Sequence, residues 1–213
     1  MSLIHGPVTA FVALEPEPAL AELIRQLKEQ TRALVGDQLY LADSPHLTVY
    51  LSVFPTPAAV LDRWPKIAQR NDDLTIHLTG WHAFEADALT GNQTLACDIA
   101  AYDKKRLRPL QCEIIELLAP VRDAIAARER FAERTEFLTS EERRSVEQYG
   151  FPYVGDGWQP HLTIASVRSA DWPAVWNTLE PLAPRGTFRC SRWRLFALID
   201  QCLVALDGIG DRD

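Results

Sequence analysis

Residues 45–49 read PHLTV and residues 160–164 read PHLTI. In each copy a proline opens an extended segment, and the alternation of polar and apolar side chains after it has the period of a β-strand. The histidine and threonine of each copy therefore point to one face of the strand, and the two aliphatic residues point to the other. Same-face neighbours on a strand lie about 6.6 Å apart, so the imidazole and the hydroxyl can contact one phosphate-sized group.

A third His-x-Thr sequence occurs at residues 77–79, but no proline precedes it. There Thr75, His77 and Thr79 share one face of an alternating segment, which is typical of the solvated face of a half-buried strand. We therefore take the two proline-led copies as the candidate site. The alternative is that their histidines are core residues held by hydrogen bonds. The candidate catalytic residues are His46, Thr48, His161 and Thr163.

Composition indicates an ordinary globular protein that acts on a small anionic ligand. The chain has 213 residues, is 47% hydrophobic and carries a formal net charge of −7, which argues against a broad basic surface for a DNA duplex. No apolar run approaches the roughly 20 residues of a membrane span, and the first residues do not resemble a signal peptide, so we expect a cytoplasmic protein without membrane contact. The cysteines lack C-x-x-C spacing and are expected to be buried, reduced thiols: Cys97, Cys112, Cys190 and Cys202.

The order of predicted elements repeats. A strand, a helix and a motif strand are predicted in the first half, and a strand, a helical region and the second motif strand follow in the second half. This order indicates a duplicated α+β fold in a single domain, 1–213, with a helical insertion at about 104–148. A pseudo-twofold arrangement would bring both motifs to one shared cleft. Strands are predicted at 9–14, 46–54, 74–84, 94–101, 193–199 and 202–206, and helices at 19–35, 56–67, 104–148 and 171–182.

The paired PHLT strands in this element order resemble the 2H phosphoesterase superfamily, which includes proteins named 2′-5′ RNA ligases and cyclic nucleotide phosphodiesterases. The resemblance implies a bilobal fold with two antiparallel sheets around a central cleft and helices on the outer faces. It also implies a site without metal or cofactor. Matched by position, His46 and His161 are the paired catalytic histidines, and Thr48 and Thr163 hold the phosphate. Residues 137–154 also resemble a branch of the superfamily found near phosphonate-degradation genes.

The chemistry of these residue types agrees with the resemblance. Hydrolysis of a cyclic phosphodiester needs a base to activate water and an acid to protonate the leaving oxygen, and two imidazoles with an ordinary pKa near 6.5 fill both roles at neutral pH. Threonine hydroxyls donate to the charged oxygens of the phosphate. We expect hydrolysis of a 2′,3′-cyclic nucleotide, an RNA end or a related small cyclic phosphate. The alternatives are an RNA end-processing or 2′-5′ RNA ligase-type enzyme, and a non-catalytic nucleotide-binding module.

Three aromatic residues are weaker candidates for substrate contact. Tyr50 continues the face of the first motif, and Tyr153 and Trp158 precede the second motif, where they would stack on a base. For each of them the alternative is ordinary packing. Specificity is expected to lie in loops such as 86–93 and 149–159.

Two groups of basic residues and one histidine are further weak candidates for binding an anion or a metal ion. A cluster at the start of a helix is expected to be a solvated face: Lys104, Lys105, Arg106 and Arg108. Alternating arginines near the C-terminus are candidates for anion binding: Arg189, Arg192 and Arg194. His82 and Glu85 fall on opposite faces of a strand, so we expect no metal site there.

Overall fold

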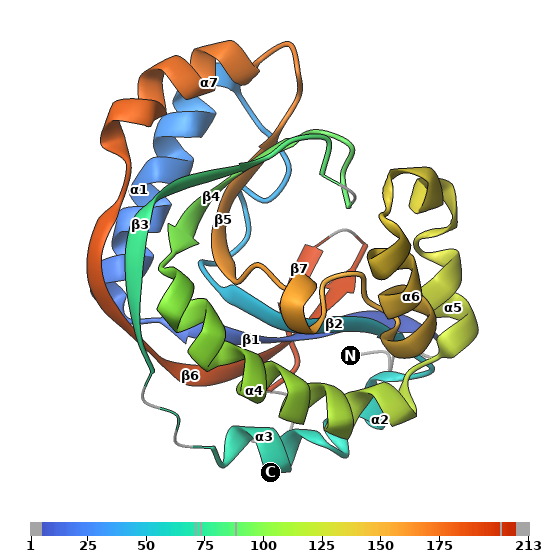
Figure 1. The fold of residues 1–213 in the computed structure, drawn as a ribbon. Helices are drawn as coiled ribbons and strands as arrows, with labels where there is room; N and C mark the ends of the chain where they lie inside the picture. The colour runs from blue at the N-terminus through green and yellow to red at the C-terminus, as the bar shows by residue number, and fades with distance from the viewer. Residues whose placement is uncertain (1–5, 71, 73, 88, 201, 208–213) are drawn as a thin grey trace.

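The computed structural model describes residues 6–70, 72, 74–87, 89–200 and 202–207, and one antiparallel β-sheet lies at its centre (Figure 1). The strands have the order β1-β2-β5-β4-β3-β6-β7, and β1 also pairs with β6, so the first six close into a ring. With helices packed around it, this sheet confirms the predicted α+β class. The strands are β1 (Val8–Pro16), β2 (Leu47–Phe54), β3 (Leu74–Phe84), β4 (Gln93–Ile99), β5 (His161–Val167), β6 (Arg185–Ile199) and β7 (Cys202–Ala205).

The ring has two halves, which are joined differently on its two sides. On one side β6 runs through both halves, because residues 185–190 pair with β3 and residues 190–198 pair with β1. On the other side β2 and β5 form one pairing, between Leu47 and Leu162. The two separate sheets expected from the resemblance are therefore two halves of one hydrogen-bonded sheet.

Each half contains the same sequence of elements. In the first half β1 leads through α1 (Pro18–Val35) to β2, and in the second half β4 leads through α4 (Ala101–Leu118) to β5. In both halves the motif strand pairs antiparallel with the strand that precedes its helix. The predicted duplication of strand, helix and motif strand is thus confirmed.

The two long helices cover the sheet with apolar faces. Helix α1 packs against α7 (Trp172–Leu179), and Figure 1 shows this pair away from α4. Each buried aliphatic side chain of this size stabilises the fold by about 1.5–3 kcal/mol. The buried aliphatic residues of these two helices are Leu20, Ile24 and Leu27 in α1, and Leu107, Ile114, Ile115 and Leu118 in α4.

A helical arm, residues 119–149, follows α4 where an insertion is predicted. Its elements are a 3-10 turn (Ala119–Val121), α5 (Ala124–Glu129), a second 3-10 turn (Ala132–Phe137) and α6 (Ser140–Tyr149). Helix α6 begins with a capping box: the Thr139 hydroxyl accepts from the Glu142 N–H at 3.2 Å, and the Glu142 carboxylate accepts from the Thr139 N–H at 2.7 Å. It ends at Gly150, whose φ of 75° is left-handed.

Several predicted elements have different bounds. The helix predicted at 56–67 is two short helices, α2 (Pro57–Leu61) and α3 (Trp64–Ala68), because Pro65 cannot donate the backbone hydrogen bond that a continuous helix needs. Strand β6 begins eight residues before the predicted start at 193. The sequence does not predict this first part, because it is polar and largely exposed and lacks a strand-like apolar pattern. Strand β4 ends at Ile99, two residues before the predicted end.

All four cysteines are free, but their burial was predicted wrongly for two of them. Cys97 and Cys190 are buried in the sheet, whereas Cys112 and Cys202 are exposed. Within the described ranges, no helix is both long enough and apolar enough to cross a membrane.

Candidate active site

The two motif strands meet at the pair Leu47 and Leu162, which occupy the same position in the two motifs. Both leucines are fully buried. Paired residues of an antiparallel sheet share a face, so the residues before and after each leucine point to the opposite face. The structure therefore brings four partly exposed side chains together around this pair: His46, Thr48, His161 and Thr163.

Both histidines are held in the same way by their own backbone. The Nδ1 atom of His46 lies 2.7 Å from the carbonyl oxygen of Ser44, and that of His161 lies 2.6 Å from the carbonyl oxygen of Gln159. A carbonyl only accepts hydrogen bonds, so Nδ1 carries the proton and Nε2 of the neutral ring has a free lone pair. Neither Nε2 atom has a hydrogen-bond partner in the described part of the chain. Both rings are thus arranged to exchange a proton with a ligand.

The two threonines lie opposite small residues at the edge of a bulge. Thr48 pairs with Ala13, and Thr163 pairs with Ala96. In both strands the next residue is skipped in the pairing, which forms a β-bulge at the same position of each motif. Neither threonine hydroxyl has a hydrogen-bond partner among residues 6–70, 72, 74–87, 89–200 and 202–207, so both are available to donate to a bound anion.

The bulge moves Tyr50 away from the face on which the sequence places it. Because Val49 is skipped in the pairing, Tyr50 turns into the core, where it is fully buried and its hydroxyl donates to the carbonyl of Tyr149 at 2.5 Å. Trp158 is also a core residue, 3% exposed. Tyr153 is half-buried, and its ring packs edge-on against Phe151. The structure therefore brings neither Tyr50 nor Trp158 to the motif residues.

Two buried polar side chains hold the loops that lead into the motifs. Lys28 of α1 is 3% exposed, and its Nζ donates to the carbonyls of Tyr40 (2.5 Å) and Asp43 (2.9 Å), just before the first motif. Gln111 of α4 is fully buried; its Nε2 donates to the carbonyls of Val49 and Tyr153, both at 3.0 Å. Its Oε1 accepts from the N–H of residue 155 at 2.9 Å, just before the second motif.

The sequence alone did not identify Lys28 and Gln111 as residues that hold these loops. Lys28 and Gln111 lie on the helices that precede the two motif strands, and each is a polar residue on a helix face that is mainly apolar. The sequence signal that could have identified them is a polar residue within the apolar stripe of a helix. Its meaning depends on which loop packs over the helix, and that is a property of the fold.

Aromatic rings line the wall beside each histidine. The His46 ring lies 5.1 Å from the ring of Phe11 and 5.7 Å from that of Phe196, centroid to centroid. The His161 ring lies 4.7 Å from Phe84. Phe11 and Phe196 are buried in a small apolar cluster that is separate from the main core. Sequence reasoning missed these three phenylalanines, because strands distant in the sequence bring them to the site.

Burial lowers the pKa of both histidines. The pKa of His46 falls to about 4, chiefly through desolvation; the carbonyl of Ser44 opposes this, and the charges of Lys28 and His161 add to it. Desolvation also lowers the pKa of His161, against the Gln159 carbonyl and the charge of Asp87. Both rings are therefore neutral at pH 7 in the empty site. A bound phosphate anion would raise both values, because a nearby negative charge favours the imidazolium form.

The basic residues near the site are mostly paired. Lys104 lies between the Asp98 carboxylate (2.7 Å) and the Gln159 side chain (3.0 Å), so it is not simply solvated as predicted. Arg194 binds Asp207 at 2.6 Å and Glu15 at 3.3 Å. Asp207 and Glu15 thus already compensate the charge of Arg194, which is one of the three arginines proposed for anion binding.

The remaining histidines have separate environments. His77 donates from its backbone N–H and ring Nδ1 to the buried carboxylate of Asp103, at 2.8 and 2.9 Å, away from the motif pair. His82 lies opposite Ala96, the partner of Thr163, and its ring contacts Phe84. Among the described residues, no group of three or more His, Cys, Asp or Glu is arranged to hold a metal ion.

Comparison with known proteins identifies related sequences and folds. A model of the 2′-5′ RNA ligase superfamily matches residues 16–198. No curated protein matches the sequence. The structure of Thermus thermophilus TT0787 is 14% identical over 93% of this chain and 94% of that chain, with a TM-score of 0.51, which supports the fold. Two further solved structures are similar over nearly their whole length. E. coli LigT complexed with NADP+ has 15% identity over 94% of both chains (TM-score 0.45), and Kluyveromyces marxianus Usb1 has 12% identity over 95% of this chain and 97% of that chain (TM-score 0.41).

Proposed function

The chain belongs to the 2′-5′ RNA ligase superfamily, whose members act on phosphodiester bonds, and we propose that it hydrolyses a small cyclic phosphodiester without a metal ion. The substrate class is a 2′,3′-cyclic nucleotide or the cyclic phosphate at an RNA end. One observation carries this proposal. In the described part of the chain, two histidines in the same fixed tautomer and two threonine hydroxyls without hydrogen-bond partners surround the single pair that joins β2 and β5.

The arrangement suits an in-line displacement at phosphorus. The hydroxyls of Thr48 and Thr163 donate to the non-bridging oxygens of the phosphate. The Nε2 of one histidine removes a proton from water, and the new P–O bond forms. The P–O bond to one ribose oxygen breaks, and the other histidine, as imidazolium, donates its Nε2 proton to that oxygen. The products are a phosphomonoester and a free hydroxyl, and the histidines return to their starting states through solvent.

The lowered pKa values fit a substrate-dependent mechanism. In the empty site both imidazoles are neutral at pH 7, so either can act as the base. The arriving phosphate raises the pKa of both, and one proton taken from solvent then supplies the acid. The enzyme therefore needs its anionic substrate to complete its catalytic set, which predicts a substrate-dependent pH profile.

The test is hydrolysis of a panel of 2′,3′-cyclic nucleotides, linear 2′-5′ dinucleotides and cyclic sugar phosphates, with EDTA present. We expect turnover by the wild type and a loss of at least about 100-fold in His46→Ala and in His161→Ala, because each removes a proton-transfer group. His77→Ala is the matched control, since His77 belongs to the third His-x-Thr sequence and lies outside the site. Wild-type turnover in either motif variant would show that the histidines are not the proton-transfer groups.

The same groups can activate a 5′-hydroxyl in place of water, so ligation of RNA ends through a 2′-5′ bond is the competing activity. In that case the new P–O bond forms to the 5′ oxygen, and the P–O bond to the 3′ oxygen breaks. Incubation with an oligonucleotide that ends in a 2′,3′-cyclic phosphate and one with a free 5′-hydroxyl separates the two activities. We expect the hydrolysed end to predominate over joined product. Affinity that falls steeply with added salt would instead indicate extended RNA contact.

A further inference from the structure

A cationic side chain that has no carboxylate partner in the described part of the chain lies on the same face of the sheet as the motif residues. Thr9, Phe11 and Ala13 alternate along β1 and share one face, and Ala13 is the partner of Thr48. Arg130, at the end of α5, reaches this face and donates from Nη1 to the Thr9 hydroxyl at 3.1 Å. Thr9 is two residues, or about 7 Å, beyond Phe11, whose ring contacts His46. The guanidinium therefore lies one side chain beyond the wall of the proposed catalytic site.

Among the residues that the structure describes, no carboxylate compensates the charge of Arg130. Arg194 on the same face binds two carboxylates, whereas Arg130 forms no ion pair within the described part of the chain. Surrounding protein lowers its pKa, although the residue remains accessible to solvent. Such a cation gains free energy when an anion replaces the missing partner.

Tyr40 has a phenol that is close enough to Arg130 to feel the charge of the guanidinium. Its backbone has a φ of 71°, an uncommon conformation for a bulky residue, and the buried Nζ of Lys28 holds its carbonyl. Burial raises the pKa of its phenol, and the charges of Asp87 and Arg130 both act on it. Its hydroxyl has no hydrogen-bond partner in the described ranges. The phenol therefore remains protonated and free to donate.

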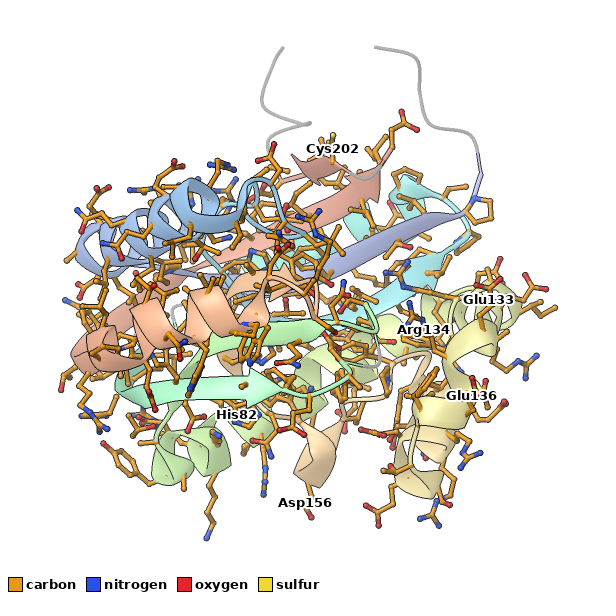
Figure 2. The ribbon with its side chains drawn as sticks, turned by 90° about the horizontal axis from the view of Figure 1, so that it is seen from above. His82, Glu133, Arg134, Glu136, Asp156 and Cys202 are labelled. Atoms are coloured by element: carbon orange, nitrogen blue, oxygen red, sulfur yellow. The ribbon has the colours of Figure 1, made fainter. Side chains whose placement is uncertain are left out.

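The helical arm keeps Arg130 in place. The backbone N–H of Asp123 donates to the carbonyl of Val53 in β2 at 2.8 Å, at the start of α5. At the far end of the arm, Arg134 donates to the carbonyl of Thr90 in the β3–β4 turn at 3.1 Å. Figure 1 shows the arm beside the ends of β1 and β2, and Figure 2 shows Arg134 on its side toward the strands. The arm is thus tied to both halves of the sheet.

We propose that Arg130, Tyr40 and Thr9 form a subsite for a second anionic group of the substrate. The proposal rests on the proposed function. In a 2′,3′-cyclic nucleotide the ribose 5′ oxygen is the remaining ester position, so the subsite takes a 5′-phosphate or, at an RNA end, the preceding phosphodiester. A nucleoside cyclic phosphate with a free 5′-hydroxyl leaves the subsite empty. The helical arm would then select the substrate class.

The first test compares kcat/KM for adenosine 2′,3′-cyclic phosphate with and without a 5′-phosphate. We expect the wild type to prefer the 5′-phosphorylated compound at least tenfold. Arg130→Met is expected to lose this preference through a higher KM, with unchanged kcat/KM for the unphosphorylated compound, and Arg130→Lys to keep part of it. The matched control is Arg128→Met, because Arg128 lies on the same helix and pairs with Glu147 at 3.2 Å. Absence of the preference in the wild type, or its persistence in Arg130→Met, would overturn the subsite.

A binding measurement separates failure of the subsite from failure of the proposed reaction. Calorimetric titration with adenosine 3′,5′-bisphosphate and with adenosine 3′-phosphate requires no turnover. Tighter binding of the bisphosphate that disappears in Arg130→Met supports the subsite even if no cyclic compound is hydrolysed. Equal affinities in the wild type refute it. A dinucleotide that ends in a cyclic phosphate distinguishes an RNA end from a mononucleotide, since its internal phosphodiester occupies the same subsite.

Discussion

The substitution Gln111→Met tests whether the buried amide holds the loop before the second motif. Methionine has a similar length but makes none of the three hydrogen bonds of Gln111, so the carbonyls of Val49 and Tyr153 and the N–H of Gly155 would each lose the bond to this amide. Each buried group left unpaired costs about 1–3 kcal/mol. With partial rearrangement, we expect a loss of about 3–6 kcal/mol in the free energy of unfolding. For a chain of this size that is about 6–24 °C in Tm.

Urea titration of wild type and variant at pH 7 measures the loss as a change in midpoint at constant slope. The matched control is Gln26→Met, because Gln26 is an exposed glutamine of α1 whose amide contacts Glu22. Surface substitutions of this kind change stability by about 0.5 kcal/mol or less. If Gln111→Met were no more destabilising than Gln26→Met, the assigned role of the buried amide would be wrong. The variant is also expected to lower kcat, since the loop it releases leads into the motif of His161.

Three further predictions concern stability. Because burial lowers the pKa of His46 to about 4, the unfolded chain binds more protons than the folded chain between about pH 4 and 6.5, so stability falls as the pH falls through this window. In urea titrations over this window, the free energy of unfolding of His46→Gln should fall less than that of the wild type, by about 1–2 kcal/mol after allowance for solvent at the ring. The lowered pKa of Lys28, about 8, has the same sign at higher pH, so wild-type stability should rise relative to Lys28→Met between pH 8 and 9.5. Gly150→Ala should cost about 2–4 kcal/mol in a thermal melt, because the new Cβ would lie 2.5 Å from the Ser52 hydroxyl at a left-handed φ.

The sequence was sufficient for the parts of the fold that depend on local pattern. The proline-led motifs at 45–49 and 160–164 located both motif strands, and the helical period over residues 19–35 located α1 within one residue. These features are encoded within a few residues. The resemblance of residues 137–154 to a phosphonate-associated branch stays a prediction.

The errors arose where the outcome depends on distant partners. Strict alternation places Tyr50 beside Thr48, but the pairing of β2 with β1 skips Val49 and turns Tyr50 into the core. The first part of β6 has little strand signal of its own, because its pairing with β3 supplies the order. Arg130 lies 121 positions from Thr9, and only the folded arm brings them together. Local pattern found the catalytic candidates, whereas their surroundings are a tertiary property.

Because β2 and β5 share one pairing, between Leu47 and Leu162, the site lies at the junction with the fewest backbone pairs in the described sheet. Elsewhere around the ring, neighbouring strands share several pairs, so this contact is the one that a small rotation of the two halves would alter most. A phosphate held by hydroxyls and imidazoles from both strands would act there as a cross-strand link that the backbone does not provide. In that case the bound substrate also stabilises the junction between β2 and β5, and product release removes this stabilisation. Slower amide exchange in both motif strands on binding of a phosphate ligand would be the visible sign.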